Sequence, residues 1–292
     1  MTRVSVPAQS PVLVAQDLSA VSAISMGVAV PLLTAFGQQL AILPTSLLST
    51  QTEGFGHPAS ADLTTWLPAT FAHWQGQQIQ THGVLTGYLG RNQIVDQLTE
   101  FIQRQNEQLV VIDPVMGDQG ALYPDLPADY PDHMRQLVHA ASVIVPNLTE
   151  AEFLTGHQVT TTDTLQSLLP ILDALQAQLQ PDGHAIITGI TLADQQGCVW
   201  LDDHHHVQFI GRPILAGHFF GSGDVFAALL TGFLLHHEPL DRAIALATRG
   251  TFWALLDTNN TPRERRYGIV LSSVMAAIAN YQQVGQFTPR LN

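Results

Sequence analysis

The 292-residue sequence contains no lysine, and all 11 of its basic residues are arginines. This absence excludes the P-loop lysine, the strand lysine of protein kinases and a lysine Schiff base. A chain of this composition that binds phosphate groups has backbone N–H groups, helix N-termini, arginine and a bound cation with which to do so. We therefore expect Mg²⁺ to accompany any nucleotide.

Cysteine is nearly absent too, since Cys198 is the only one. This excludes an internal disulfide and a multi-cysteine metal site, and we interpret Cys198 as a small apolar strand residue. No apolar run is long enough to span a bilayer, and residues 1–7 lack the features of a signal peptide, so we expect a cytoplasmic protein. The net charge of −13 argues against nucleic acid or an anionic membrane as a partner.

Strand-like and helical patterns alternate along most of the sequence. Apolar runs typical of buried strands lie at 11–15, 41–44, 83–88, 109–112, 142–145 and 185–189, and helical patterns lie at 21–36, 61–75, 92–105, 132–141 and 149–179. This alternation predicts an α/β fold with a central, mostly parallel sheet and helices on both faces. No repeat or linker marks a boundary, so we expect one domain over residues 1–292.

The pattern changes after residue 197. Two short runs at 197–201 and 206–210 predict a β-hairpin that could act as a lid or clamp near a phosphate site. Its histidines, 204–206, alternate in direction along the chain, so we interpret them as a solvated turn, not a metal site. Helices are expected from Asp224 to near 256 and from 267 to 281, with a break at 257–262.

The glycine-rich stretch Gly217–Asp224 comes directly before an apolar helical pattern. Its glycines favour a tight turn, and a helix should begin near Ser222 or Gly223. Such an N-terminus offers unpaired N–H groups and partial positive charge to a phosphoryl group. Asp224 would lie in the first turn, either as a base for a substrate hydroxyl or only as a complement to the helix dipole.

Two acidic motifs follow strand-like runs. In Asp113–Asp118 (DPVMGD) the first aspartate could simply open a turn, and in Val145–Glu152 (VPNLTEAE) Asn147 or Thr149 could simply cap a helix. Ligands of parallel α/β sheets bind beyond the carboxyl ends of the strands. We therefore expect the polar residues that follow the strand-like runs to converge on one edge: Asp17, Ser19, Thr52, Tyr88, Asp113 and Asn147.

In their order, these three motifs resemble those of the pyridoxal (vitamin B6) kinases of the ribokinase-like superfamily. Leu85–Tyr88 resembles the TGY segment of that family. Asp17–Ser19, together with Leu43–Thr52, is similar to the substrate-side segments of its Gram-positive bacterial branch. The resemblance extends over most of the chain and implies ATP-dependent phosphorylation of the 5′-hydroxymethyl group of pyridoxal, pyridoxine or pyridoxamine, by an enzyme that forms a homodimer.

The resemblance implies a catalytic role for the glycine-rich stretch. Asp224 would be the base, and Gly221, Ser222 and Gly223 would form the anion hole, with Gly221 and Gly223 also contacting the nucleotide. The transfer would be in line, without a covalent enzyme intermediate.

The resemblance also implies a metal and nucleotide side of the site. Asp118 and Glu150 would hold Mg²⁺, partly through water. Asn147 and Thr188 would lie near the phosphates of ATP, with Asp113 as a polar group behind them. A requirement for a monovalent cation is left open.

On the substrate side, the resemblance assigns the pyridine ring to Asp17 or Ser19, Thr52 and Tyr88, whose flat ring suits stacking. The sequence departs from the family there, because residues 20–23 replace the usual glycines and arginine. Val145 and Ser222 each replace a threonine.

Two alternatives stay open, the first because it is similar in fold and phosphorylates a comparable heteroaromatic alcohol, the second because residues 20–23 are altered. One is the hydroxymethylpyrimidine kinase of thiamine synthesis, which generally carries cysteine at the position of Asp224 and lacks the Gly117–Asp118 continuation. The other is a non-catalytic protein that binds B6 compounds.

Overall fold

The computed structural model describes residues 10–105, 109–159, 162 and 164–289. The first nine residues, on which the prediction about a signal peptide rests, lie outside this part. The main sheet of the described chain has nine strands in the order β11-β10-β9-β8-β5-β4-β1-β2-β3. They are β1 (Val12–Ser19), β2 (Leu40–Leu48), β3 (Ser60–Ala61), β4 (Gly83–Thr86), β5 (Leu109–Ile112), β8 (Val143–Ile144), β9 (His184–Leu192), β10 (Gln195–Leu201) and β11 (Val207–Pro213).

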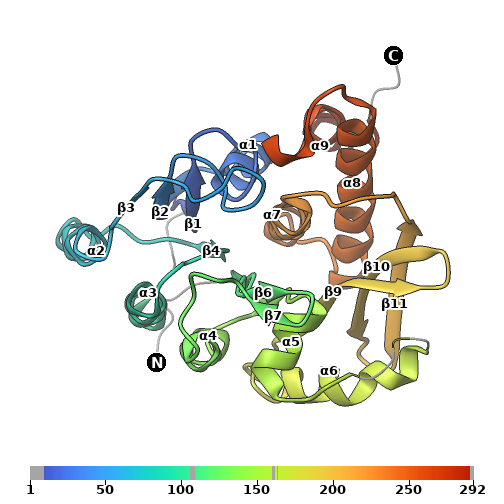
Figure 1. Ribbon diagram of the computed structural model, residues 1–292, viewed down its shortest axis with the longest axis horizontal. Helices are drawn as coiled ribbons and strands as arrows, with labels where there is room; N and C mark the ends of the chain where they lie inside the picture. The colour runs from blue at the N-terminus through green and yellow to red at the C-terminus, as the bar shows by residue number, and fades with distance from the viewer. Residues whose placement is uncertain (1–9, 106–108, 160–161, 163, 290–292) are drawn as a thin grey trace.

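The central six strands, β2-β1-β4-β5-β8-β9, are parallel, whereas β3, β10 and β11 are antiparallel additions at the two edges. A separate two-stranded hairpin consists of β6 (Gly117–Asp118) and β7 (Ala121–Leu122). Helices lie on both faces of the main sheet (Figure 1). The predicted α/β fold with a central, mostly parallel sheet and helices on both faces is confirmed.

Each face of the sheet is covered by its own set of helices. One apolar core contains residues of α1 (Met26–Ala35), α7 (Ser222–Leu235), α8 (Leu240–Asn260) and α9 (Ser272–Val284). The other contains residues of α2 (Trp66–Gly76), α3 (Asn92–Arg104), α4 (Tyr130–Val138), α5 (Leu148–Thr155) and α6 (Leu169–Gln176). Short 3₁₀ turns, η1 (Leu165–Leu168) and η2 (Arg265–Tyr267), complete the described elements.

The central strands supply side chains to both cores. In β5, Val111 packs into the core of α1 and α7, whereas Val110 and Ile112 pack into the opposite core. Because both faces are covered, these strands are apolar without a break, which is the pattern used to predict them. Among the described helices, none has the length and apolar character needed to cross a membrane.

Three predicted boundaries in the first third of the chain are wrong. β1 continues to Ser19, so Asp17 and Ser19 lie within the strand instead of after it. The next helix begins at Met26, not at 21, because the intervening segment is bound to the C-terminal part of the chain through a bridge between Ala23 and Gly268. α2 begins at Trp66, not at 61, because β3 pairs with the end of β2.

The C-terminal helices also differ from the prediction. The chain after Asp224 forms two helices, α7 and α8, which separate before Pro239, a residue that lacks the N–H needed inside a helix. α8 extends into the predicted break as far as Asn260, with the Thr258 hydroxyl bonded back to the Ala254 carbonyl at 2.7 Å. The last helix begins at Ser272, later than predicted.

The predicted hairpin is formed by β10 and β11. Its exposed tip lies against α6, where His205 Nε2 is 3.0 Å from Asp173 Oδ1, and its opposite end, with Gln196 and Arg212, reaches the large pocket described below. The tip is therefore not a lid over that pocket. Cys198 is buried in β10, as expected.

Candidate active site

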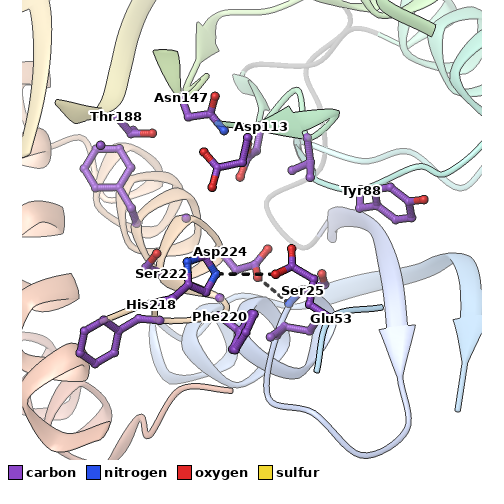
Figure 2. A pocket seen from close by; sticks show the side chains of 18 of the residues that line it. Ser25, Glu53, Tyr88, Asp113, Asn147, Thr188, His218, Phe220, Ser222 and Asp224 are labelled. Atoms are coloured by element: carbon purple, nitrogen blue, oxygen red, sulfur yellow. Dashed lines mark hydrogen bonds and ion pairs between the residues drawn. The ribbon is translucent and has the colours of Figure 1, made fainter. Parts of the chain in front are cut away.

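A cavity of about 950 Å³ opens at the carboxyl ends of the parallel strands, where the three predicted motifs meet. Figure 2 shows Asp113 and Asn147 facing Asp224 and Ser222 across this space, with Tyr88 to one side. Twelve of the thirteen predicted site residues line it: Asp17, Thr52, Tyr88, Asp113, Asp118, Asn147, Glu150, Thr188, Gly221, Ser222, Gly223 and Asp224. Ser19 does not line the cavity; its hydroxyl donates a hydrogen bond to Asp17 Oδ2 at 3.2 Å.

The glycine-rich stretch turns sharply into α7, which begins at Ser222 as predicted. Gly221 precedes the helix with a φ of +93°, a conformation that favours glycine, and a Cβ there would meet Ile24 at 3.2 Å. Within the described chain, the N–H groups of Gly223 and Asp224 have no hydrogen-bond acceptor. The helix N-terminus therefore presents free donors and its partial positive charge to the cavity.

Asp224 lies in the first turn of α7, partly buried within the cavity. Its Oδ2 accepts a hydrogen bond from the backbone N–H of Ser25 at 2.8 Å (Figure 2). Burial raises the pKa of Asp224 to about 7, with a further contribution from the charge of Asp17, while the Ser25 bond opposes the shift. A carboxylate with this pKa, held at one oxygen, is suited to accept a proton near neutral pH.

The junction Asn147–Glu150 is a complete helix cap. Asn147 Oδ1 accepts from Glu150 N at 2.9 Å, and the Glu150 carboxylate accepts from Asn147 N at 2.8 Å. Asn147 Nδ2 donates to Gly117 O at 2.8 Å, so the cap also positions the hairpin that carries Asp118. The capping interpretation of Asn147 is thus confirmed, although the residue also lines the cavity.

Acidic groups crowd this side of the cavity. Glu150 is buried, and its second oxygen accepts from Met116 N at 3.1 Å. Burial raises the pKa of Glu150 to about 8, and Asp118 raises it further while backbone hydrogen bonds oppose the shift. Burial also raises the pKa of Asp113 well above its usual value, with contributions from Glu150 and Asp224. A cation bound among these carboxyl groups would lower their pKa values and favour the ionised forms.

The donor set fits Mg²⁺. Asp118 has one oxygen bound to Gln119 N at 2.8 Å and the other directed to no partner within the described chain. Together with Glu150 it offers only oxygen ligands, which is the preference of Mg²⁺. In the described part of the chain no three acidic, histidine or cysteine side chains gather into a full metal cage.

The other end of the cavity is formed by Tyr88 and Asp17. The Tyr88 carbonyl accepts from Thr45 Oγ1 at 2.8 Å, which fixes the residue after β4, and burial raises the pKa of the Tyr88 phenol to about 12. Asp17 is buried, and burial raises its pKa as well, while hydrogen bonds from Ser25 and Ser19 oppose the shift. Both groups are therefore held in place at this end of the cavity, as suits an aromatic ligand with polar substituents.

Sequence analysis missed several residues of the cavity wall. Ser25 escaped notice because its contribution is a backbone N–H, which its side chain does not reveal. Glu53 and His218 come from segments on opposite sides and approach to 4.0 Å between Oε2 and Nε2 (Figure 2). Arg212 is the only arginine among the described lining residues. Because the chain has no lysine, each arginine is a candidate phosphate ligand, and this was the only signal in the sequence that pointed to Arg212.

The sheet, the glycine-rich N-terminus of α7 and the acidic junctions define a fold and a site of the ribokinase-like class. A model of the phosphomethylpyrimidine kinase family matches residues 48–266. The chain belongs to this family, and the predicted resemblance to pyridoxal kinases is confirmed by its relatives.

The relatives include a pyridoxal kinase from Deinococcus radiodurans, 32% identical over 205 residues that cover 65% of this chain and 66% of that protein. Matches to the first curated relatives span 58–66% of their length, less than two thirds. A crystal structure of pyridoxal kinase from Lactobacillus plantarum is 46% identical with a TM-score of 0.89, covering 94% of this chain and 99% of that one. A Bacteroides thetaiotaomicron protein assigned to the phosphomethylpyrimidine kinases and crystallised with pyridoxal is 29% identical with a TM-score of 0.84, covering 92% and 96%.

Proposed function

We propose that this protein transfers the γ-phosphoryl group of ATP to the 5′-hydroxymethyl group of a B6 vitamer. The observation that carries the proposal is the position of Asp224 beside the free N–H groups of the α7 N-terminus, in one cavity with Asp118 and Glu150. Identity of 46% with the Lactobacillus plantarum pyridoxal kinase, over nearly the full length of both chains, supports the choice of substrate.

In the proposed reaction, Asp224 accepts the proton of the substrate alcohol while the alcohol oxygen attacks the γ-phosphorus. The bond from that phosphorus to the β,γ-bridging oxygen breaks, and ADP leaves. Ser25 N holds one carboxylate oxygen, which leaves the other to face the alcohol. The N–H groups at Gly223 and Asp224, with the dipole of α7, stabilise negative charge on the phosphoryl group.

Asp118 and Glu150 are the residues that would hold Mg²⁺, and the bound ion would neutralise phosphate charge in this acidic cavity. Asn147, Thr188 and Asp113 shape the nucleotide side. Tyr88, Thr52 and Asp17 bind the pyridine ring, with Ser19 supporting Asp17 through its hydrogen bond.

Hydroxymethylpyrimidine phosphorylation is the second candidate, favoured by the name of the matching family. A steady-state assay with ATP and Mg²⁺ separates the candidates when pyridoxal, pyridoxine, pyridoxamine and hydroxymethylpyrimidine are compared. We expect kcat/KM to be highest for a B6 vitamer. Preference for hydroxymethylpyrimidine would transfer the proposal to the second candidate, and binding of pyridoxal without turnover would support the non-catalytic alternative.

The homodimer, the cytoplasmic location and the single domain stay predictions. Light scattering of the purified chain tests the first of them.

A further inference from the structure

One short turn outside the cavity contacts both loops that border it. The turn η2 carries Arg265 and Arg266, neither of which lines the cavity. Arg265 contacts the glycine-rich stretch, whereas Arg266 contacts the segment 51–55 after β2. Adjacent side chains thus reach two pocket segments that are separated by more than 150 positions in the sequence.

Arg265 binds the glycine-rich stretch in two ways. Its guanidinium donates to the carbonyl of Ala216, directly before the stretch, at 2.8 Å and to that of His218 at 3.5 Å, and it lies over the Phe219 ring at 4.0 Å from the centroid. A second nitrogen donates to Asn259 Oδ1 at 2.8 Å, which fixes the plane of the guanidinium against α8. A Cβ on Gly217, where φ is +96°, would lie 2.2 Å from Arg265 Nη1, so the first glycine of the motif makes room for this arginine.

Arg266 binds the opposite segment. It donates to the Gly54 carbonyl at 3.0 Å and lies over the Phe55 ring at 4.6 Å. Its own carbonyl accepts from the Gln51 side chain, and Glu264 forms an ion pair with the guanidinium at 2.8 Å. These contacts hold the segment that brings Thr52 and Glu53 to the cavity.

The turn itself is fixed to the floor of the site. Ala23 N donates to the Tyr267 carbonyl at 3.0 Å, and Ile269 N donates to the Ala23 carbonyl at 3.0 Å. Two residues after Ala23, the backbone N–H of Ser25 donates to the Asp224 carboxylate. The turn therefore has a rigid connection to the carboxylate that the two loops surround.

We propose that Arg265 and Arg266 are positioning residues with separate effects, an inference that rests on the proposed function. Arg265 fixes the glycine-rich stretch and so affects phosphoryl transfer, whereas Arg266 fixes segment 51–55 and so affects binding of the vitamer. Guanidinium groups suit this role because they combine planar hydrogen bonding with ring stacking, which a lysine amine cannot reproduce. Small displacements of reacting groups are costly, which gives such contacts a kinetic effect.

The test compares Arg265→Ala and Arg266→Ala with Arg263→Gln. Arg263 is the matched control, because it donates to Gly268 O within the turn and contacts neither loop. We expect Arg265→Ala to lower kcat about 10²-fold with little change in the KM for pyridoxal, and Arg266→Ala to raise that KM about tenfold with kcat nearly kept. Arg263→Gln should keep both values. Added guanidinium ion should partly restore the alanine variants, and Arg265→Lys should stay impaired.

Amide hydrogen exchange of the chain without ligands gives a second readout that needs no turnover. In Arg265→Ala, exchange should increase at 217–223 and stay unchanged at 51–56. In Arg266→Ala, it should increase at 51–56 and stay unchanged at 217–223. The inference would be overturned if both alanine variants changed kcat and KM in the same way, or if Arg263→Gln showed the same effects. Unchanged amide exchange in the alanine variants would also overturn it. A wild-type chain that phosphorylates no vitamer would instead contradict the proposed function, and exchange alone would then decide whether the two arginines hold the loops separately.

Discussion

The surroundings of Asp224 disfavour its ionised form, and the proposed role of this carboxylate as a base depends on that form. The cavity wall withdraws it from water, and Asp17 adds repulsion, so its pKa rises to about 7. The Ser25 N–H and the dipole of α7 act in the opposite direction and keep the ionised form accessible near neutral pH. The residue thereby has the proton affinity that a general base needs.

The raised pKa predicts an acid limb in the pH profile. Because Asp224 must be ionised to accept a proton, kcat/KM for a B6 vitamer should fall about tenfold per pH unit below about pH 7. Steady-state rates between pH 5 and 9 measure this. The same limb should appear with pyridoxal and pyridoxamine, since it belongs to the enzyme, and a limb near pH 4 for both would contradict the assignment.

The same shift predicts a stability effect. The native chain binds a proton at Asp224 more tightly than the unfolded chain does, so the wild type loses stability as the pH rises from about 4 to about 7. Asp224→Asn removes this loss. The variant should be more stable than wild type by about 2–4 kcal/mol at pH 8, with the gain vanishing near pH 4.

Urea unfolding at both pH values measures the difference. Asp203→Asn, on the exposed hairpin tip, is the control and should show no gain that depends on pH in this way. Equal stability of wild type and Asp224→Asn at pH 8 would mean that the carboxylate is not penalised by its surroundings.

The start of α7 is the element on which the site depends, and two of its glycines have different roles. Gly221 has a left-handed conformation, and a Cβ there would crowd Ile24 and the Ala23 carbonyl. Gly223 is helical, and a Cβ there would come no closer than 3.7 Å, to Asp113. The backbone conformation therefore favours glycine at 221, whereas position 223 has room for a larger side chain.

We therefore expect Gly221→Ala to lower the free energy of unfolding by about 1–2 kcal/mol or more. Gly223→Ala should leave it unchanged or raise it slightly, because alanine favours a helix. Thermal unfolding compares the two variants. The opposite order would show that the loop does not have this conformation.

Sequence patterns predicted the elements best where one local signal acted alone. β5 was predicted with its observed bounds because an apolar run is followed directly by Asp113–Pro114. The start of α7, although not its end, was predicted because glycines come directly before a helical pattern. The start of α1 was misplaced because its N-terminal boundary is set by Ala23 pairing with Gly268, more than 240 positions away. The short β6–β7 hairpin was missed because two-residue strands leave no periodicity.

The site was predictable to a similar degree. Side chains in motifs, such as Asp118 and Glu150, were found, and their convergence followed from the rule that parallel strands end at one edge. Backbone donors such as Ser25 N, and contacts made through η2, depend on tertiary structure and leave no sequence signal.

At the scale of the whole molecule, the sheet brings seven acidic side chains and one arginine to the wall of a single cavity: Asp17, Glu53, Asp113, Asp118, Asp125, Glu150, Asp224 and Arg212. We therefore expect an anionic nucleotide to bind there only together with a compensating cation. Asp118 and Glu150 are held by backbone N–H groups, so we expect the fold not to depend on a bound cation.

Removal of divalent ions should therefore separate activity from folding. With EDTA we expect turnover to be lost and the circular dichroism spectrum and melting temperature to stay unchanged, and added Mg²⁺ should restore turnover. Asp118→Asn should raise the Mg²⁺ concentration for half-maximal rate. Full turnover in EDTA would contradict the assignment of an acidic metal side.

The central claim is that the Asp224 carboxylate removes the proton from an alcohol held against the N-terminus of α7. The most direct test is the rate of pyridoxal phosphate formation by wild type and Asp224→Asn, alongside the affinity of each for pyridoxal. The account predicts that the variant loses turnover by a factor of about 10³ or more while it binds pyridoxal nearly as well as wild type. Turnover within a few-fold of wild type would contradict it.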